Sequence, residues 1–166
     1  MHSNSTANLL NLKGVFVNKV SHSYESIKIF ISTKPKKTKC PLCGLVTSKV
    51  HDYRNQIIKD LPISAKNVYL VLRKRRYVCS CGKRFYEKYD FLPRYYRMTN
   101  RLAAYICDEL TKSVSLSYIA EQSNVSVPTV IRIFDKVQYP KLNKLPEVLS
   151  IDEFKGNAET GKYQCI

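Results

Sequence analysis

Two pairs of closely spaced cysteines constrain this chain more than any other feature of its sequence. Cys40 and Cys43 form the motif CPLCG, and Cys79 and Cys81 form CSCGKRF, so each pair stands beside a glycine in a turn-like stretch. Four thiolates satisfy the tetrahedral preference of Zn²⁺, and two such loops brought together by β-strands make a zinc ribbon. The sequence therefore predicts a structural Zn²⁺ site whose ligands are Cys40, Cys43, Cys79 and Cys81.

The spacing of these cysteines leaves alternatives open. The second pair is CxC rather than CxxC, and the gap between the pairs is longer than the usual ribbon spacing. His51 could replace one thiolate, and two disulfides or four free thiols are the other interpretations. The N-terminus lacks the features of a signal peptide, and clustered thiols in a reducing cytoplasm favour metal over disulfides. Cys107 and Cys165 fit as core residues of a helix and a strand.

Positive charge is concentrated in the middle of the chain. The 166 residues carry a net charge of +15, and the segment Lys34–Arg101 holds 18 basic and 4 acidic residues, which is +14 of that total. Such an excess attracts polyanions, nucleic acid first among them. A solvated charged surface is the alternative for any single basic run. The expected phosphate contacts are Arg73, Lys74, Arg75, Arg76, Lys83, Arg84, Arg94, Arg97 and Arg101.

The first half of the chain has the residue pattern of a small all-β module. The stretches GVFVNKV and SIKIFIST predict two strands around a polar turn at 21–25. KVHDYRNQIIKDL and KNVYLVLRKRRYVC predict two more strands around the break at 62–64, because both are rich in β-branched and aromatic residues. No apolar run approaches the ~18 residues that a membrane span needs. We therefore expect no membrane partner and a cytoplasmic location.

The pattern becomes helical at Thr99. TNRLAAYICDELTK has apolar residues at helical spacing, and Thr99 or Asn100 can cap its start. SYIAEQSNVSVPTVIRIF then fits a helix-turn-helix, with Ala120 at the close approach of two helices and Asn124 in a left-handed turn. A three-helix packing unit without DNA contact is the alternative. The residues expected to face a major groove or its phosphates are Ser126, which also caps the second helix, Thr129, Arg132 and Lys136.

Taken in order, CPLCG, RKRRYVCSCGKRF, FLPRYYRMTNRL, IAEQSNVSVPTVIRIF and LPEVLSIDEFKGNA resemble the ISL-three family of bacterial insertion-sequence transposases. The resemblance spans roughly residues 37–166. It implies an α+β multidomain protein: a small β-rich zinc-ribbon module, a three-helix helix-turn-helix, and the first strands of an RNase H-like catalytic domain of the DDE type. The expected division is an N-terminal β-hairpin segment at 1–36, the ribbon at 37–92, the helix-turn-helix at 93–140 and the truncated start of the catalytic domain at 146–166.

Asp152, in the motif SIDEFKG, corresponds under this resemblance to the first catalytic aspartate. By composition alone, an aspartate after an apolar strand is usually a turn residue. DNA cleavage and strand transfer of this type use two Mg²⁺ ions, and one carboxylate cannot hold both. Mg²⁺ is therefore expected only in a complete catalytic domain, and we expect these 166 residues alone to have no transposase activity.

The partner implied by the resemblance is double-stranded DNA that carries the terminal inverted repeats of the element. A homo-oligomer is left open. The alternative function is a DNA-binding-only regulator, or a truncated transposase that acts as a repressor by occupying the ends. A third hypothesis makes the basic ribbon an RNA-binding module, and the helix-turn-helix argues against it.

Overall fold

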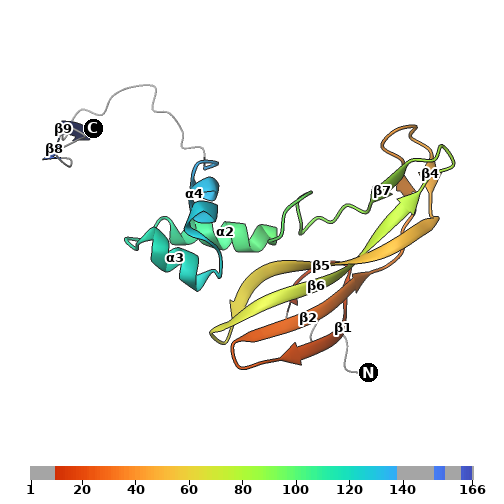
Figure 1. Ribbon diagram of the computed structural model, residues 1–166, viewed down its shortest axis with the longest axis horizontal. Helices are drawn as coiled ribbons and strands as arrows, with labels where there is room; N and C mark the ends of the chain where they lie inside the picture. Colours follow the sequence, from red (N-terminus) through yellow and green to blue (C-terminus); the bar gives the residue numbers. More distant parts are fainter. Residues whose placement is uncertain (1–9, 138–151, 156–161, 166) are drawn as a thin grey trace.

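The structure is a computed structural model that describes residues 10–137, 152–155 and 162–165. A twisted β-sheet and three helices make up most of the molecule, with the helices beyond one end of the sheet (Figure 1). No helix in these residues is long and apolar enough to cross a membrane. The strands are β1 Val15–His22, β2 Ser26–Thr33, β3 Thr38–Lys39, β4 Val46–Thr47, β5 Val50–Ile63, β6 Lys66–Val78, β7 Arg84–Tyr86, β8 Asp152–Lys155 and β9 Lys162–Cys165, and the helices are α2 Asn100–Glu109, α3 Leu116–Gln122 and α4 Val127–Phe134.

The main sheet has the strand order β1-β2-β6-β5, and β7 pairs with the outer part of β6. The two hairpins expected from the sequence both form: β1 pairs antiparallel with β2, and β5 pairs antiparallel with β6. The N-terminal hairpin is part of this sheet, because β2 pairs in parallel with β6. Ser64 and Ala65 join β5 to β6 with φ of 51° and 58°. Such positive values allow a two-residue turn to follow the twist of its strands.

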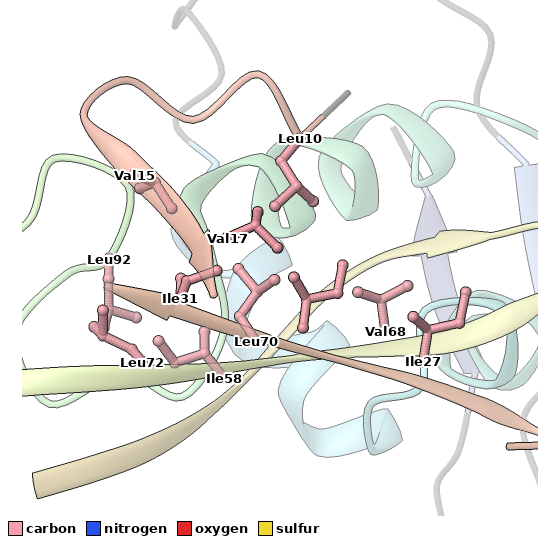
Figure 2. Close-up of a cluster of buried hydrophobic side chains, with 11 residues drawn as sticks. Leu10, Val15, Val17, Ile27, Ile31, Ile58, Val68, Leu70, Leu72 and Leu92 are labelled. Carbon is pink, nitrogen blue, oxygen red and sulfur yellow. The ribbon is translucent and has the colours of Figure 1, made fainter. Parts of the chain in front are cut away.

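The core of the sheet lies on one face, as the period-two alternation of strands requires. On β2 the alternating residues Ile27, Ile29 and Ile31 are buried, and Leu70 and Leu72 of β6 pack beside them (Figure 2). The same cluster also contains Leu10, Val15, Val17, Ile58, Val68 and Leu92. Because Leu92 follows β7, the chain between β7 and α2 (the connector, residues 87–99) is anchored on this face.

The three helices form the expected helix-turn-helix unit around a second apolar cluster. Thr99 caps α2 and accepts a hydrogen bond from the backbone N–H of Leu102. Ser115 caps α3 in the same way. The cluster is built from Met98, Leu102, Ile106, Ile119, Ala120 and Val130, with Val125 and Ile133 packed against it. Ala120, which the sequence predicted at the close approach of two helices, is buried in this cluster.

The turn of the helix-turn-helix docks on the end of the sheet. Asn124 has φ of 51°, the left-handed conformation predicted for it. Its side-chain amide donates to the hydroxyl of Tyr69 on β6 over 2.8 Å, and its carbonyl accepts from Nζ of Lys59 on β5 over 2.5 Å. These contacts fix α4 relative to the sheet.

The capping prediction for Ser126 needs a correction. Ser126 occupies the N-cap position of α4, but its hydroxyl makes no capping hydrogen bond to the backbone. Instead it lies 3.0 Å from the hydroxyl of Thr129. The two side chains satisfy each other, and Pro128 in the first turn contributes no N–H for a cap.

β8 and β9 form an antiparallel pair in the last part of the chain. Asp152 is the first residue of β8 and is opposite Cys165 on β9. The family resemblance also implies a hairpin turn at 156–161. That turn and the side chains of Asp152 and Cys165 lie outside the described residues.

Candidate metal centre and nucleic-acid interface

The four cysteines of the two motifs converge on one point. Sγ of Cys40 lies 3.7 Å from Sγ of Cys81, and Sγ of Cys43 lies 3.5 Å from Sγ of Cys79. All four sulfurs lie within 4.8 Å of one another. A disulfide needs about 2.05 Å, whereas Zn–S bonds of about 2.3 Å in a tetrahedron separate the sulfurs by about 3.8 Å. The geometry fits Zn²⁺ and rules out disulfides between these pairs.

Two glycine turns build this metal centre. Gly44 and Gly82 follow the two pairs with φ of 74° and 82°. In each loop the glycine N–H donates to the carbonyl of the first cysteine, Gly44 to Cys40 over 3.0 Å and Gly82 to Cys79 over 2.9 Å. These turns bring the second sulfur of each pair back beside the first. The short strands β3, β4 and β7 carry the loops.

Backbone N–H groups lower the pKa of two of the four thiols, which favours the thiolate form that binds a metal ion. The N–H of Cys81 and the neighbouring thiols lower the pKa of Cys79 to about 6. Burial raises the pKa of Cys40, but the N–H groups of Cys43 and Leu42 and nearby thiols outweigh it, so the pKa is lowered. The N–H of Leu45 lowers the pKa of Cys43, but the surrounding sulfurs raise it to about 12. A bound Zn²⁺ would favour the thiolate form at all four positions, because the cation offsets the repulsion among the sulfurs.

His51 is not part of this centre. Its Nδ1 lies 3.1 Å from Oδ2 of Asp52 on β5. The four-sulfur cluster is complete without it.

Arg75, predicted to contact DNA, is buried and paired within the fold. Its side chain is 6% exposed, and its guanidinium pairs with the carboxylate of Glu87, itself 1% exposed, over 3.0 Å. The same guanidinium donates to the hydroxyl and the carbonyl of Thr33 and to the carbonyl of Lys34. Alternation along β6 places Arg75 on the same side as Tyr77, which is also buried.

Arg101 likewise holds the protein together. Its guanidinium pairs with Asp60 on β5, whose side chain is fully buried, and also donates to the carbonyl of Leu10. Thr99 donates to the same carboxylate over 2.7 Å. This network ties α2 to the sheet and engages the guanidinium of Arg101 within the fold, so a contact of Arg101 with DNA stays a prediction.

Other basic side chains, together with two tyrosines and a glutamine, contact one another in a row from the sheet to the end of α4. We define the cation–aromatic row as Arg76, Tyr86, Lys74, Gln56, Tyr96 and Lys136. Lys74 and Arg76 lie 4.9 Å and 5.8 Å from the ring centroid of Tyr86, and Nζ of Lys74 donates to Gln56 over 3.2 Å. Gln56 donates to the carbonyl of Tyr96, whose ring lies 5.0 Å from Nζ of Lys136.

The electrostatics of this row favour an anionic partner. Burial and the neighbouring charge of Arg94 lower the pKa of Lys74. Like charges that are held close together gain from a bound polyanion. Several further predicted contacts are exposed, namely Arg73, whose guanidinium lies 4.1 Å from the ring of Tyr53, Lys83, Arg84, Arg94 and Arg97.

The residues expected to contact DNA lie on α4 and at its two ends: Thr129 and Arg132 are in the helix, Ser126 is its N-cap residue and Lys136 follows its C-cap. Arg132 and Lys136 are exposed, and Thr129 is partly exposed. The guanidinium of Arg132 donates to the carbonyl of Pro128 and to the hydroxyl of Thr129. Thr129, Arg132 and Ser126 thus form one polar cluster at the start of the helix.

Comparison with known families decides what these two modules are. The zinc-finger model of the transposases IS204, IS1001, IS1096 and IS1165 matches residues 36–82. The helix-turn-helix model of transposase family ISL3 matches residues 87–138. The chain belongs to the ISL3 transposase family. It carries the zinc ribbon and the helix-turn-helix of that family, which is the ISL-three family indicated by the motifs.

A curated relative of this ISL3 chain supports the assignment. The transposase for insertion sequence element IS1001 of Bordetella parapertussis is 31% identical over 135 residues. The match covers 78% of this chain and 33% of that protein, so the chain spans about a third of the relative's length. No solved structure matches the chain.

Sequence reasoning missed several partners of the basic residues of this ISL3 chain. Tyr53 and Gln56 on β5 support Arg73 and Lys74, and Glu87 neutralises Arg75. For Tyr53 and Gln56 the register of β5 against β6 is the signal. They lie two residues along β5 from Asn55 and Arg54, the direct partners of Arg73 and Lys74, but β-bulges shift that register and hide it from simple counting.

Proposed function

We propose that this chain is the DNA-binding region of a bacterial, cytoplasmic transposase and that it recognises the terminal inverted repeats of its element in double-stranded DNA. The observation that carries the proposal is the cation–aromatic row, which joins the basic sheet to the end of α4 through Tyr96 and Lys136. A helix-turn-helix gains base contacts from its second helix and affinity from phosphate contacts. Here both would come from one connected surface.

In this arrangement α4 lies in the major groove. Ser126, Thr129 and Arg132 contact base edges or nearby phosphates, and Lys136 contacts the backbone at the far end of the helix. Lys74 lies five residues along β6 from Tyr69, which contacts the helix-turn-helix. That is about 17 Å along a strand, or about half of a ~34 Å turn of B-DNA. The sheet would extend the contact beyond the groove that α4 occupies.

The test is the salt dependence of binding to a mixed-sequence duplex, measured by fluorescence anisotropy. We expect the logarithm of the binding constant to fall linearly with the logarithm of salt concentration, with a slope of about −0.9 per neutralised phosphate. Lys74→Ala and Lys136→Ala should each reduce the magnitude of the slope by about 1. The matched control is Lys19→Ala, because Lys19 is exposed on β1 at the opposite edge of the sheet.

Two outcomes would contradict this proposal. If the binding constant did not change with salt concentration, the proposed phosphate contacts would be contradicted. Binding of a structured RNA as tightly as duplex DNA would favour the RNA-binding hypothesis, since α4 has no groove to read in A-form RNA.

We further propose that Asp152 is the first metal-binding carboxylate of an RNase H-like DDE catalytic domain. Two Mg²⁺ ions would activate the attacking oxygen and stabilise the leaving oxygen. Mg²⁺ takes several oxygen ligands, so other carboxylates of the complete protein would have to join Asp152. What supports this is the position of Asp152 at the start of a strand that pairs with β9, together with the family membership.

Asp152→Ala separates binding from catalysis. In the 166-residue chain we expect the variant to bind duplex DNA and zinc as the wild type does. In the complete transposase we expect it to abolish Mg²⁺-dependent cleavage of the element ends, measured on a labelled duplex. Unchanged cleavage would assign Asp152 to a structural turn and leave the chain a binding-only regulator.

A further inference from the structure

A strained turn lies in the connector, beside the end of α4. The backbone N–H of Tyr96 donates to the carbonyl of Pro93 over 3.2 Å, which closes a four-residue turn. Tyr95 occupies its third position with φ of 69°. Glycine or asparagine normally fills that position, because a Cβ disfavours a left-handed backbone. Strained residues of this kind persist where the surrounding structure holds them, commonly at functional sites.

Burial does not explain why a tyrosine stands there. Tyr95 is 84% exposed, and the guanidinium of Arg94 lies 4.7 Å from the centroid of its ring. Arg97, two residues later, is also exposed. The turn therefore offers one aromatic ring and two guanidinium groups to solvent.

The turn is held rigidly by its flanks. Leu92 before it and Met98 after it are 5% and 8% exposed and belong to the two apolar clusters. The carbonyl of Arg97 accepts a hydrogen bond from the backbone N–H of Lys59 on β5. A preorganised turn of this kind loses little entropy when it binds.

The position of the turn identifies the groove that it faces. The hydroxyl of Tyr96 accepts from Nζ of Lys136, so the turn abuts the C-terminal end of α4. A helix lying in the major groove has a phosphate backbone at its end and the next minor groove beyond that backbone. Arginine is attracted to the negative potential of a narrow minor groove, and inserted side chains wedge its base steps.

We propose that the turn Pro93–Tyr96 enters the minor groove adjacent to the major groove that α4 occupies. Arg94 and Arg97 bind along the floor and walls of that groove, and the ring of Tyr95 packs against its sugars and base edges. The preferred DNA is then A·T-rich beside the site of α4, because guanine places an amino group in the minor groove. This inference rests on the proposed function.

The test compares two duplexes of about three helical turns, ~30 base pairs. One is a mixed sequence, and the other carries inosine in place of every guanine, which removes the minor-groove amino group and leaves the major-groove edge unchanged. We expect the wild-type chain to bind the inosine duplex at least about threefold more tightly. Tyr95→Gly and Arg94→Ala should each bring that ratio close to one.

Tyr95→Gly also separates this role from a structural one. Glycine adopts φ of 69° without strain, so the thermal midpoint should not fall while the groove preference is lost. The matched control is Tyr24→Ala, because Tyr24 is 93% exposed in the β1–β2 turn. This control should keep the ratio.

The outcomes are distinct. Equal binding of the two duplexes by the wild type overturns the minor-groove proposal, and so does a preference that survives in both Tyr95→Gly and Arg94→Ala. Failure of the wild type to bind either duplex overturns the proposed function, and this inference with it.

Discussion

Cys79→Ser is expected to abolish zinc binding and to unfold the metal-binding end of the sheet. Cys79 is buried, and its sulfur lies 3.5 Å from that of Cys43. The strands β3, β4 and β7 at this end of the sheet are two or three residues long and have few side chains to bury. Metal binding contributes on the order of 10–16 kcal/mol in small zinc domains, so it supplies the folding free energy that these strands lack.

The measurement is zinc content by plasma mass spectrometry, together with amide hydrogen exchange. We expect about one Zn²⁺ per wild-type chain and none in Cys79→Ser, with rapid exchange at the N–H groups of Gly44 and Gly82. Cys107→Ser is the matched control, because Cys107 lies on α2 and outside the four-sulfur cluster. It should retain full zinc and full protection. Slow exchange of those glycines after a chelator has removed the metal would show that the loops fold without it.

Glu87→Ala is expected to destabilise the chain by about 3–5 kcal/mol, because it leaves the guanidinium of Arg75 buried without its counter-ion. The carboxylate of Glu87 also accepts from the hydroxyls of Thr33 and Tyr89. Loss of this carboxylate would break the contacts that join β2, β6 and the connector at this place. Urea unfolding followed by tyrosine fluorescence measures the effect, since the chain has 12 tyrosines and no tryptophan.

The double variant Arg75→Met, Glu87→Leu is the control for this effect. An apolar pair of similar volume removes both charges together and usually restores most of the stability. DNA affinity of the folded double variant should match the wild type, because Arg75 does not reach the surface. A large loss of DNA affinity in the double variant would return Arg75 to the set of DNA contacts.

Local patterns predicted the elements of this fold well. A few consecutive residues are enough to recognise the alternation of Ile27, Ile29 and Ile31 or the helical spacing after Thr99. The strands and helices could therefore be placed from sequence. The zinc ligands could be predicted for the same reason, because both cysteine pairs are local motifs with a glycine beside them.

Contacts between distant residues could not be predicted in this way. Within the basic run, Arg73 and Arg75 are indistinguishable by composition, yet one is exposed and the other is neutralised by Glu87, 12 residues away. Arg101 depends on Asp60, 41 residues away. A bulge between Asp60 and Ile63 shifts the β5–β6 register, so the cross-strand partners could not be counted from the turn. The turn at Tyr95 could not be predicted, because the position has neither of the residues, glycine or asparagine, that normally mark such a turn.

The docking of Asn124 on Tyr69 and Lys59 has a consequence for how target preference can change in this family. A helix-turn-helix domain joined by a flexible linker can be replaced by another such domain without changing the rest of the protein. Here the loop between its helices contacts β5 and β6, so residues of the sheet fix the orientation of α4. If α4 binds DNA as proposed, substitutions at Tyr69 or Lys59 would change the preferred sequence by reorienting the helix.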